Sequence, residues 1–287
     1  MLKTNLERIG MISVEGQIAH PEYPGNGYMG ADGMTRIMPG TGGITYNARI
    51  GDPCCGWSAD HLEPCVTTKN YDRGRSGAYT NFACIGNRAI VISGEAKGTE
   101  GFVTGKHGGV DHVICDFDPQ ALDKMNIGDR IKVIGWGQGL ELTDYPGVTC
   151  RSLSPQLLEK MNITEKDGKL YIGVRRIVPG KLMGAGVGST GTGNGDYDIT
   201  LFDPETAAEY GLMDLRFGDL VAIPDSDTRY SRTYMAGAMT IGVAVHSDSF
   251  SGGHGPGVTN LMCCIDGTIV PVLDEKANLK TLFIDEK

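Results

Sequence analysis

The sequence predicts an α+β protein that is predominantly β, built from small barrel-like β units with short capped helices. Glycine accounts for 43 of the 287 residues, roughly twice its usual share, which favours a chain with many turns. The chain also holds 11 tyrosines and many valines, isoleucines and threonines, residue types that are enriched in strands. The helices that can be predicted are short, and each begins with a cap residue followed by proline.

The N-terminal part of the chain has the pattern of short strands separated by tight turns. Residues 11–14 and 35–38 alternate weakly between apolar and polar side chains, and the prolines and glycines at 21–27 mark a loop between them. A further β-like run occupies residues 44–47, directly after two glycines. We assign residues 1–85 to an N-terminal β region.

Residues 86–117 form the most specific β pattern. It predicts a strand, a tight turn that carries Lys97-Gly98, a second strand, and a third strand from Val110 to Phe117. This pattern resembles the KOW element of small SH3-like barrels, which binds RNA in ribosomal and transcription proteins. The resemblance implies the local β geometry of a KOW/SH3-like unit, which we extend over residues 86–150. Because the chain is acidic overall, we do not carry over the RNA partner.

Three segments share a capped helix that precedes a strand. Proline at the first helical position has a suitable φ and lacks an N–H group that would be unsatisfied there anyway. The cap and proline pairs are Asp118-Pro119, Ser154-Pro155 and Asp203-Pro204. In two of these segments a Gly-Asp turn leads into a β-branched strand, and we interpret Asp129 and Asp219 as turn formers. The last two segments belong to a C-terminal α+β unit, residues 151–287, of a single compact protein.

Charge and hydropathy exclude several classes of partner. The net charge of −9 disfavours nucleic acid, because affinity for phosphate backbones depends on lysine and arginine. No apolar run approaches the roughly 20 residues that span a bilayer, and residues 1–8 lack an apolar signal core. We therefore expect a cytoplasmic protein with a small-molecule substrate and no membrane partner. A homo-oligomer is the expectation for a cytosolic enzyme.

The eight cysteines fit a reducing compartment. They include two adjacent pairs and no CxxC pair of the kind found in zinc ribbons. We expect reduced thiols, several of them buried as small hydrophobic side chains. The alternative is that Cys54, Cys55 or Cys65 joins His61 in a metal or thiolate site.

A glycine-rich segment covers residues 184–195. A Rossmann fingerprint requires a helix directly after such glycines, and a P-loop requires Gly-Lys-Ser/Thr. Here Asp196-Tyr197-Asp198-Ile199 follows and predicts a strand instead. We therefore interpret the segment as a surface loop or lid rather than a phosphate cradle.

Five of the six histidines lie in glycine-rich or acid-rich segments. Histidine titrates near neutral pH and is the commonest metal ligand, and neighbouring glycines let the backbone approach a ligand closely. His61 lies between Asp60 and Glu63, whose carboxylates can orient an imidazole or share a metal with it. His107 follows Lys106 in a glycine turn that suits recognition of an anion or a carbonyl group. We expect His112, within a strand, to be a half-buried structural residue.

The C-terminal histidines form the strongest functional signal. His246 ends an apolar strand, and residues i and i+2 of a strand share one face, so His246 and Asp248 can point into one site. His254 sits in a constrained turn between glycines. As polar surface positions, both histidines should tolerate glutamine with a change in stability within about 1 kcal/mol, while ligand or metal affinity is lost.

Taken together, these segments resemble a bacterial family known as domain of unknown function 4438. The resemblance spans nearly the whole chain, implies a single, largely β protein and brings no activity with it. Cys65 stands where the family pattern leads us to expect glycine, which argues against a required thiol at that position. The residues that carry the resemblance are 42–47, 60–64, 97–109, 136–140, 196–199 and 245–257.

The function that these residues favour is a hydrolase or lyase acting on a small polar metabolite. A divalent ion with mixed nitrogen and oxygen ligands, such as zinc, manganese or iron, can activate water. We predict an amide or cyclic amide substrate, because glycine-framed Asp and His loops occur in acetamidases and formamidases. The predicted metal ligands are His61, His246, His254 and Asp60, and the predicted acid-base residues are His107, Lys106, Asp248 and Glu63.

Two other classes of catalysis find less support. The chain has neither the G-x-S-x-G elbow of serine hydrolases nor the HExxH motif of zincins. The rival to an enzyme is a module that binds a small molecule, RNA or a protein through Arg88, Lys97 and Lys106 of the KOW-like segment. Such binding weakens steeply with salt, and nearby acidic residues offset these three cations.

Overall fold

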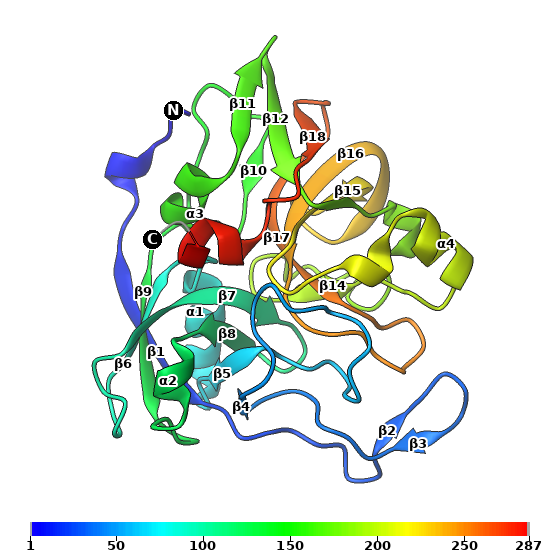
Figure 1. Cartoon of the computed structure of the whole chain (residues 1–287). Helices are drawn as coiled ribbons and strands as arrows, with labels where there is room; N and C mark the ends of the chain where they lie inside the picture. The colour runs from blue at the N-terminus through cyan, green and yellow to red at the C-terminus, as the bar shows by residue number, and fades with distance from the viewer. Residues whose placement is uncertain (1, 286–287) are drawn as a thin grey trace.

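Six strands of this protein close into a β-barrel, at the lower left of Figure 1. The computed structural model describes residues 2–285. The strand order is β1-β9-β6-β7-β8-β5-β4, and β1 also pairs with β5, which closes the barrel and leaves β4 attached outside it. The bounds are β1 Ile12–Ile18, β4 Ile44–Thr45, β5 Cys65–Lys69, β6 Arg88–Val91, β7 Glu100–His107, β8 His112–Asp116 and β9 Arg130–Gly135.

A second sheet packs beside the barrel. Its strands run in the order β10-β17-β16-β15-β13, with β14 paired to β17. Their bounds are β10 Thr149–Cys150, β13 Arg176–Ile177, β14 Asp196–Asp198, β15 Leu220–Asp227, β16 Thr233–Ala244 and β17 Gly257–Cys264. Two small sheets complete the β structure, β11 Ile163–Lys166 with β12 Lys169–Val174 and β18 Ile269–Leu273, and β2 Tyr28–Met29 with β3 Thr35–Arg36. The predicted fold class, predominantly β with barrel and short helices, is confirmed.

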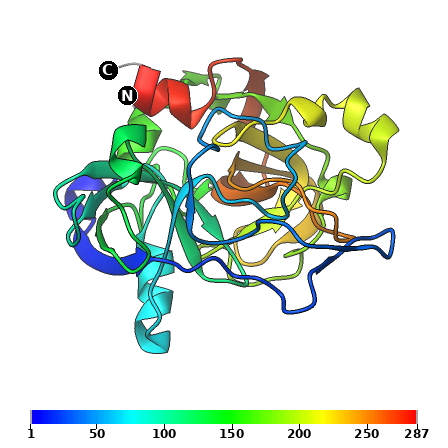
Figure 2. The same cartoon turned by 60° about the horizontal axis from the view of Figure 1, so that its bottom comes forward.

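The helices are short and lie around the sheets. The three predicted caps are confirmed, since Asp118, Ser154 and Asp203 each accept a hydrogen bond from a backbone N–H of the first helical turn. Helix α1 was not predicted, because its two glycines weaken the helical pattern. Asp72 caps this helix. Figure 2 shows α1 in cyan, extending from the barrel. The bounds are α1 Arg73–Phe82, α2 Pro119–Leu122, α3 Pro155–Lys160, α4 Pro204–Glu209, and the helical turns Leu6–Arg8, Gly180–Leu182, Leu212–Asp214 and Thr281–Asp285.

The predicted strands of residues 86–117 are β6, β7 and β8, so that local β geometry is confirmed. They pair with β5 and β9, and the barrel therefore takes strands from both sides of residue 85. The runs predicted at 11–14, 35–38 and 44–47 contain β1 in part, β3 and β4. Among the described residues, no helix is both long and apolar enough to cross a membrane.

The barrel and the second sheet touch at β7 and β17. The Thr259 hydroxyl accepts a hydrogen bond from the Lys106 N–H at 3.1 Å and donates one to the Lys106 carbonyl at 2.9 Å. Next to this contact, Gly105 leaves room for Val245, because a Cβ at that glycine would lie 2.7 Å from the valine side chain. One continuous hydrophobic core therefore runs from inside the barrel to the second sheet.

The cysteines are free thiols, and seven of the eight are buried. Burial raises the pKa of Cys55 and of Cys65 to about 12, so both are neutral thiols at physiological pH. The backbone at Cys65 has a φ of 59°, in the left-handed region that favours glycine, which explains why glycine was expected there. Its sulfur accepts a hydrogen bond from the Phe117 N–H instead of facing His61.

The two aspartates predicted as turn formers have that role. Asp129 accepts a hydrogen bond from the Asn126 N–H, and Asp219 accepts one from the Arg216 N–H, each three residues back along the chain. Asp219 is completely buried, and this burial raises the pKa of its carboxyl group to about 6 although Asn278 donates a hydrogen bond to it.

This raised pKa predicts how stability depends on pH. The folded state holds the Asp219 proton more tightly than the unfolded chain, so ionisation costs stability as pH rises from about 4 to about 6. Asp219→Asn cannot ionise. The free energy of unfolding of this variant minus that of wild type, both measured in urea, should therefore increase by up to about 3 kcal/mol across that window. A difference that stays flat with pH would contradict the assignment.

Candidate metal centre

The four histidines of the predicted site converge at the junction between the barrel and the second sheet. The ring centroid of His61 lies 5.6 Å from that of His107, 5.0 Å from that of His246 and 5.0 Å from that of His254. His107 and His246 stack with their centroids 4.2 Å apart. Segments separated by almost 200 residues thus bring their imidazoles into one cluster.

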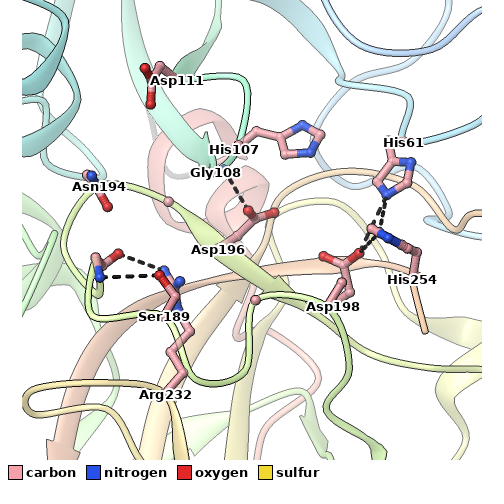
Figure 3. A pocket seen from close by; sticks show the side chains of 15 residues that line it. His61, His107, Gly108, Asp111, Ser189, Asn194, Asp196, Asp198, Arg232 and His254 are labelled. Atoms are coloured by element: carbon pink, nitrogen blue, oxygen red, sulfur yellow. Dashed lines mark hydrogen bonds and ion pairs between the residues drawn. The ribbon is translucent and has the colours of Figure 1, made fainter. Parts of the chain in front are cut away.

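The first group, called the outer site below, consists of His61, His254 and Asp198. Figure 3 shows the two imidazoles and the carboxylate pointing toward one another. The His61 Nε2 lies 3.1 Å from the His254 Nδ1 and 3.5 Å from the Asp198 Oδ2, and the His254 Nδ1 lies 3.0 Å from the same oxygen. The Nδ1 of His61 faces Asp60 at 2.5 Å. Asp60 therefore orients the ring so that Nε2 is directed into the group.

The second group, called the inner site below, consists of His107, His246 and Asp196. All three side chains are buried, and one potential ligand atom from each lies within 4.8 Å of the others. His246 donates from Nδ1 to the Ser247 carbonyl at 2.9 Å, because a carbonyl oxygen only accepts. Its Nε2 is thereby directed at Asp196, whose Oδ2 is 2.8 Å away.

Two atoms of the inner site have no hydrogen-bond partner. Although the His246 Nε2 and the Asp196 Oδ2 are only 2.8 Å apart, their alignment does not form a hydrogen bond, and both are fully buried. Buried polar atoms without partners are rare in proteins, since each costs about 1 to 3 kcal/mol. The two atoms thus meet as an ion pair whose alignment leaves the hydrogen-bonding capacity of both unsatisfied.

Glu63 forms the outer layer of the inner site. Its Oε1 accepts from the His107 Nδ1 at 2.6 Å, and His112 donates to the same carboxylate at 3.0 Å. The Gly42 N–H and the Thr67 hydroxyl complete its partners. Burial alone would raise the pKa of Glu63, but the charges and hydrogen bonds of His112 and His107 hold it well below its usual range. Glu63 is thus an ionised residue that fixes the direction of His107.

Asp198 links the two sites. While its Oδ2 faces the outer imidazoles, its Oδ1 lies 3.7 Å from the His246 Nε2 of the inner site. Burial opposes ionisation of both strand aspartates, yet the imidazoles of His246, His254 and His61 that face Asp198 lower its pKa. The pKa of Asp196 is lowered in the same way by His107 and His246. Asp198 is thereby within reach of both groups.

Gly257 lies directly below the inner site. A Cβ at this position would lie 2.0 Å from the Asp196 Oδ2 and 2.2 Å from the His246 Nε2. No other residue type fits there without moving the two ligand atoms, so the glycine allows them to meet. Gly257 pairs with Asp198 in the β14–β17 ladder, which fixes this register.

A cavity of about 360 Å³ opens over both sites. Its wall includes His61, His107 and His254, and the glycine-rich segment 184–195 forms much of the other side. That segment was interpreted as a surface loop or lid, and it covers the candidate centre. A cavity of this size is near the lower limit for small-ligand sites.

Three of the four predicted acid-base residues lie outside this cavity, namely Glu63, described above, Lys106 and Asp248. Lys106 is completely buried below the glycine-rich segment, where its ammonium group donates to the Gly193 carbonyl at 2.7 Å and to the Ser152 hydroxyl at 3.0 Å. Burial lowers the pKa of Lys106 to about 8. Asp248 accepts a hydrogen bond from the Gly56 N–H at 3.3 Å. Strand β16 ends at Ala244, so the alternation that was expected to place Asp248 beside His246 does not extend that far.

Sequence reasoning missed Asp196 and Asp198, which are central to the two sites. The signal was present, because the two aspartates alternate with Tyr197 in a predicted strand and so share one face.

Comparison with known proteins places this arrangement in a family. The N-terminal domain of the family described as domain of unknown function (DUF4438) matches residues 28–159, and its C-terminal domain matches residues 160–283. The chain belongs to the DUF4438 family. The crystal structure of TM1086 is similar, with 42% sequence identity and a TM-score of 0.93 over 97% of this chain and 98% of that one. No curated protein matches the chain.

The two DUF4438 domains both contribute to each site. The N-terminal domain supplies His61 to the outer site and His107 to the inner one. The C-terminal domain supplies one aspartate and one histidine to each site. The candidate centre therefore lies on the boundary between the two domains of the family.

His254 and His246, which were both expected to tolerate glutamine, differ in burial. The His254 side chain is 41% exposed, whereas His246 is fully buried between two aspartates. In metal-free protein, we expect His254→Gln to change the free energy of unfolding by no more than about 1 kcal/mol. His246→Gln should cost about 3 kcal/mol, because it leaves buried carboxylates without their partner. Urea unfolding with a chelator present measures both, and equal losses would contradict this reading of the site.

Proposed function

We propose that this protein is a two-metal hydrolase that cleaves a small amide. The observation that carries the proposal is the buried pair of the His246 Nε2 and the Asp196 Oδ2, which lie 2.8 Å apart as an ion pair without a hydrogen bond, next to a second group of ligand type. A divalent cation would take both atoms as ligands and so satisfy both of them together.

The donor atoms support a first-row divalent ion at each site. Two imidazoles and one carboxylate form each group, a mixed set that suits zinc, manganese or iron. Asp60 and Glu63 stand behind His61 and His107, and the Ser247 carbonyl stands behind His246. Such outer partners fix the tautomer of a metal-bound imidazole. Asp60, predicted from the sequence as a ligand, has this supporting role in the proposal.

Hydrolysis follows from what such ions supply. Divalent ions held by these two groups would lower the pKa of bound water toward about 7 and would polarise a carbonyl oxygen. The protein holds the ligands rigidly, since β14 is fixed by its pairing with β17 and His107 ends a barrel strand. His61, His107 and His254 line the cavity, so a substrate placed there contacts both sites.

An amide is the substrate class that we propose for this cavity. Glycine-framed histidine and aspartate loops also occur in acetamidases and formamidases, an analogy of sites rather than of folds. A volume of about 360 Å³ accommodates a small linear or cyclic amide.

Ammonia or amine release from a panel of small amides tests this activity. Acetamide, formamide, a five-membered lactam and N-acetylglycine, incubated with protein loaded with zinc or manganese, should include at least one substrate. Treatment with a chelator should reduce its turnover to background, and added metal should restore it. Turnover that survives metal removal would contradict the two-metal proposal, as would the absence of turnover on every amide tested.

Metal content provides an independent prediction. Elemental analysis of protein purified without a histidine tag should find two divalent ions per chain. Asp196→Asn should lose the ion of the inner site and keep the other, whereas Asp198→Asn should weaken both because this carboxylate faces both groups. Asp248→Asn is the matched control and should keep two ions, since Asp248 belongs to neither group. Wild-type protein without stoichiometric metal would contradict the proposal.

The rival interpretation, a binding module that uses the KOW-like segment, receives little support. Of its three proposed contacts, Lys106 is buried and Arg88 is paired with Glu100 across the β6–β7 hairpin. Only Lys97 remains as an unpaired candidate among those three. Small-molecule binding at the histidine cavity is therefore the better basis for function, and a homo-oligomeric state stays a prediction.

A further inference from the structure

One arginine in the wall of the cavity has no anionic partner. Arg232 is only 2% exposed, and within the described residues it forms no ion pair, while its Nε makes no hydrogen bond. Burying a guanidinium is costly unless a negative group compensates it. Burial lowers the pKa of Arg232. The negative charges of Asp196 and Asp198 partly offset this decrease, although neither carboxylate forms an ion pair with the guanidinium.

The guanidinium is held in a fixed position. Its Nη2 donates to the Gly191 carbonyl at 3.0 Å, and its plane lies over the Tyr197 ring, 5.5 Å from the centroid. The Arg232 backbone also pairs with Ser189 and Gly188 of the glycine-rich segment. Figure 3 shows the side chain at the cavity wall, with its head group beside Ser189 and below Asp196. A rigid, buried donor next to a reaction site costs little entropy when a ligand binds.

We infer that Arg232 binds a carboxylate of the substrate, so that the amide cleaved at the metal centre belongs to an acyl amino acid or a similar anionic amide. The inference rests on the proposed function, since it takes the amide to lie at the two sites. Apart from histidines, Arg232 is the one cationic side chain among the described residues that line the cavity. A single guanidinium matches a carboxylate monoanion in charge and in its two-donor geometry.

Two isosteric probes test the inference. N-acetylglycine and N-acetylglycinamide have the same length and the same internal amide, and only the first carries a carboxylate. Calorimetry on the protein as purified, with metal content measured on the same sample, should find N-acetylglycine bound at least about tenfold more tightly, as expected for a charge-assisted contact. A phosphonate analogue of the same frame should bind less tightly than N-acetylglycine.

Variants identify the group responsible. Arg232→Gln should reduce the preference to within about twofold with unchanged metal content, and Arg232→Lys should keep part of it because the charge remains. Arg229→Gln is the matched control, since Arg229 pairs with Asp227 and does not line the cavity. Thermal melting checks that each variant folds. If Arg232→Gln does not fold, the preference measured for Arg232→Lys tests the inference instead.

Several outcomes would overturn the inference. They are a preference that persists in Arg232→Gln, equal binding of both probes by wild type, binding of neither probe, or tighter binding of the phosphonate. Metal-loaded protein without an Arg232-dependent preference would overturn this inference alone. Metal-free protein that shows the preference would overturn the two-metal proposal and leave the carboxylate site in place.

Discussion

Buried negative charge is the constraint around which this structure is organised. Asp196 and Asp198 occupy the interior where the barrel meets the second sheet, and a carboxylate in such surroundings must be compensated. Four imidazoles from four separate segments surround the pair. Three of these rings are oriented in turn by Asp60, by Glu63 and by a backbone carbonyl. The loops that carry the histidines have their particular paths because the two aspartates require these partners.

Strand geometry makes that arrangement rigid. The residue between the two aspartates, Tyr197, points to the opposite face of β14, where it is buried in a second core and its hydroxyl pairs with Ser226. Opposite Asp198 in the ladder stands Gly257, the position where a side chain would displace ligand atoms. A shift of one residue in this pairing would turn both carboxylates out of the site. The same ladder thus fixes both the charge and the space around it.

Local patterns in the sequence predicted the fold class, the three capped helices and the histidines, but not the acidic centre of the site. The alternation argument was applied to His246 and Asp248, where the strand ends too early, and not to Asp196 and Asp198, where it holds. The glycine turn after Lys106 favoured recognition of an anion or a carbonyl group, whereas the β7 pleat and the segment above it bury this side chain. Which segments meet depends on pairing between β14 and β17 and on contact between two sheets. Such long-range contacts leave no local signal.

The position of the centre on the boundary between the two DUF4438 domains has a mechanical consequence. Each site joins one histidine of the N-terminal domain to an aspartate and a histidine of the C-terminal domain. An ion bound at either site would therefore act as a cross-link between two parts of the chain, in the way that a disulfide restrains a long loop. The same contacts that would activate water would also hold the two halves in one orientation, so catalytic competence and domain docking would rise and fall together.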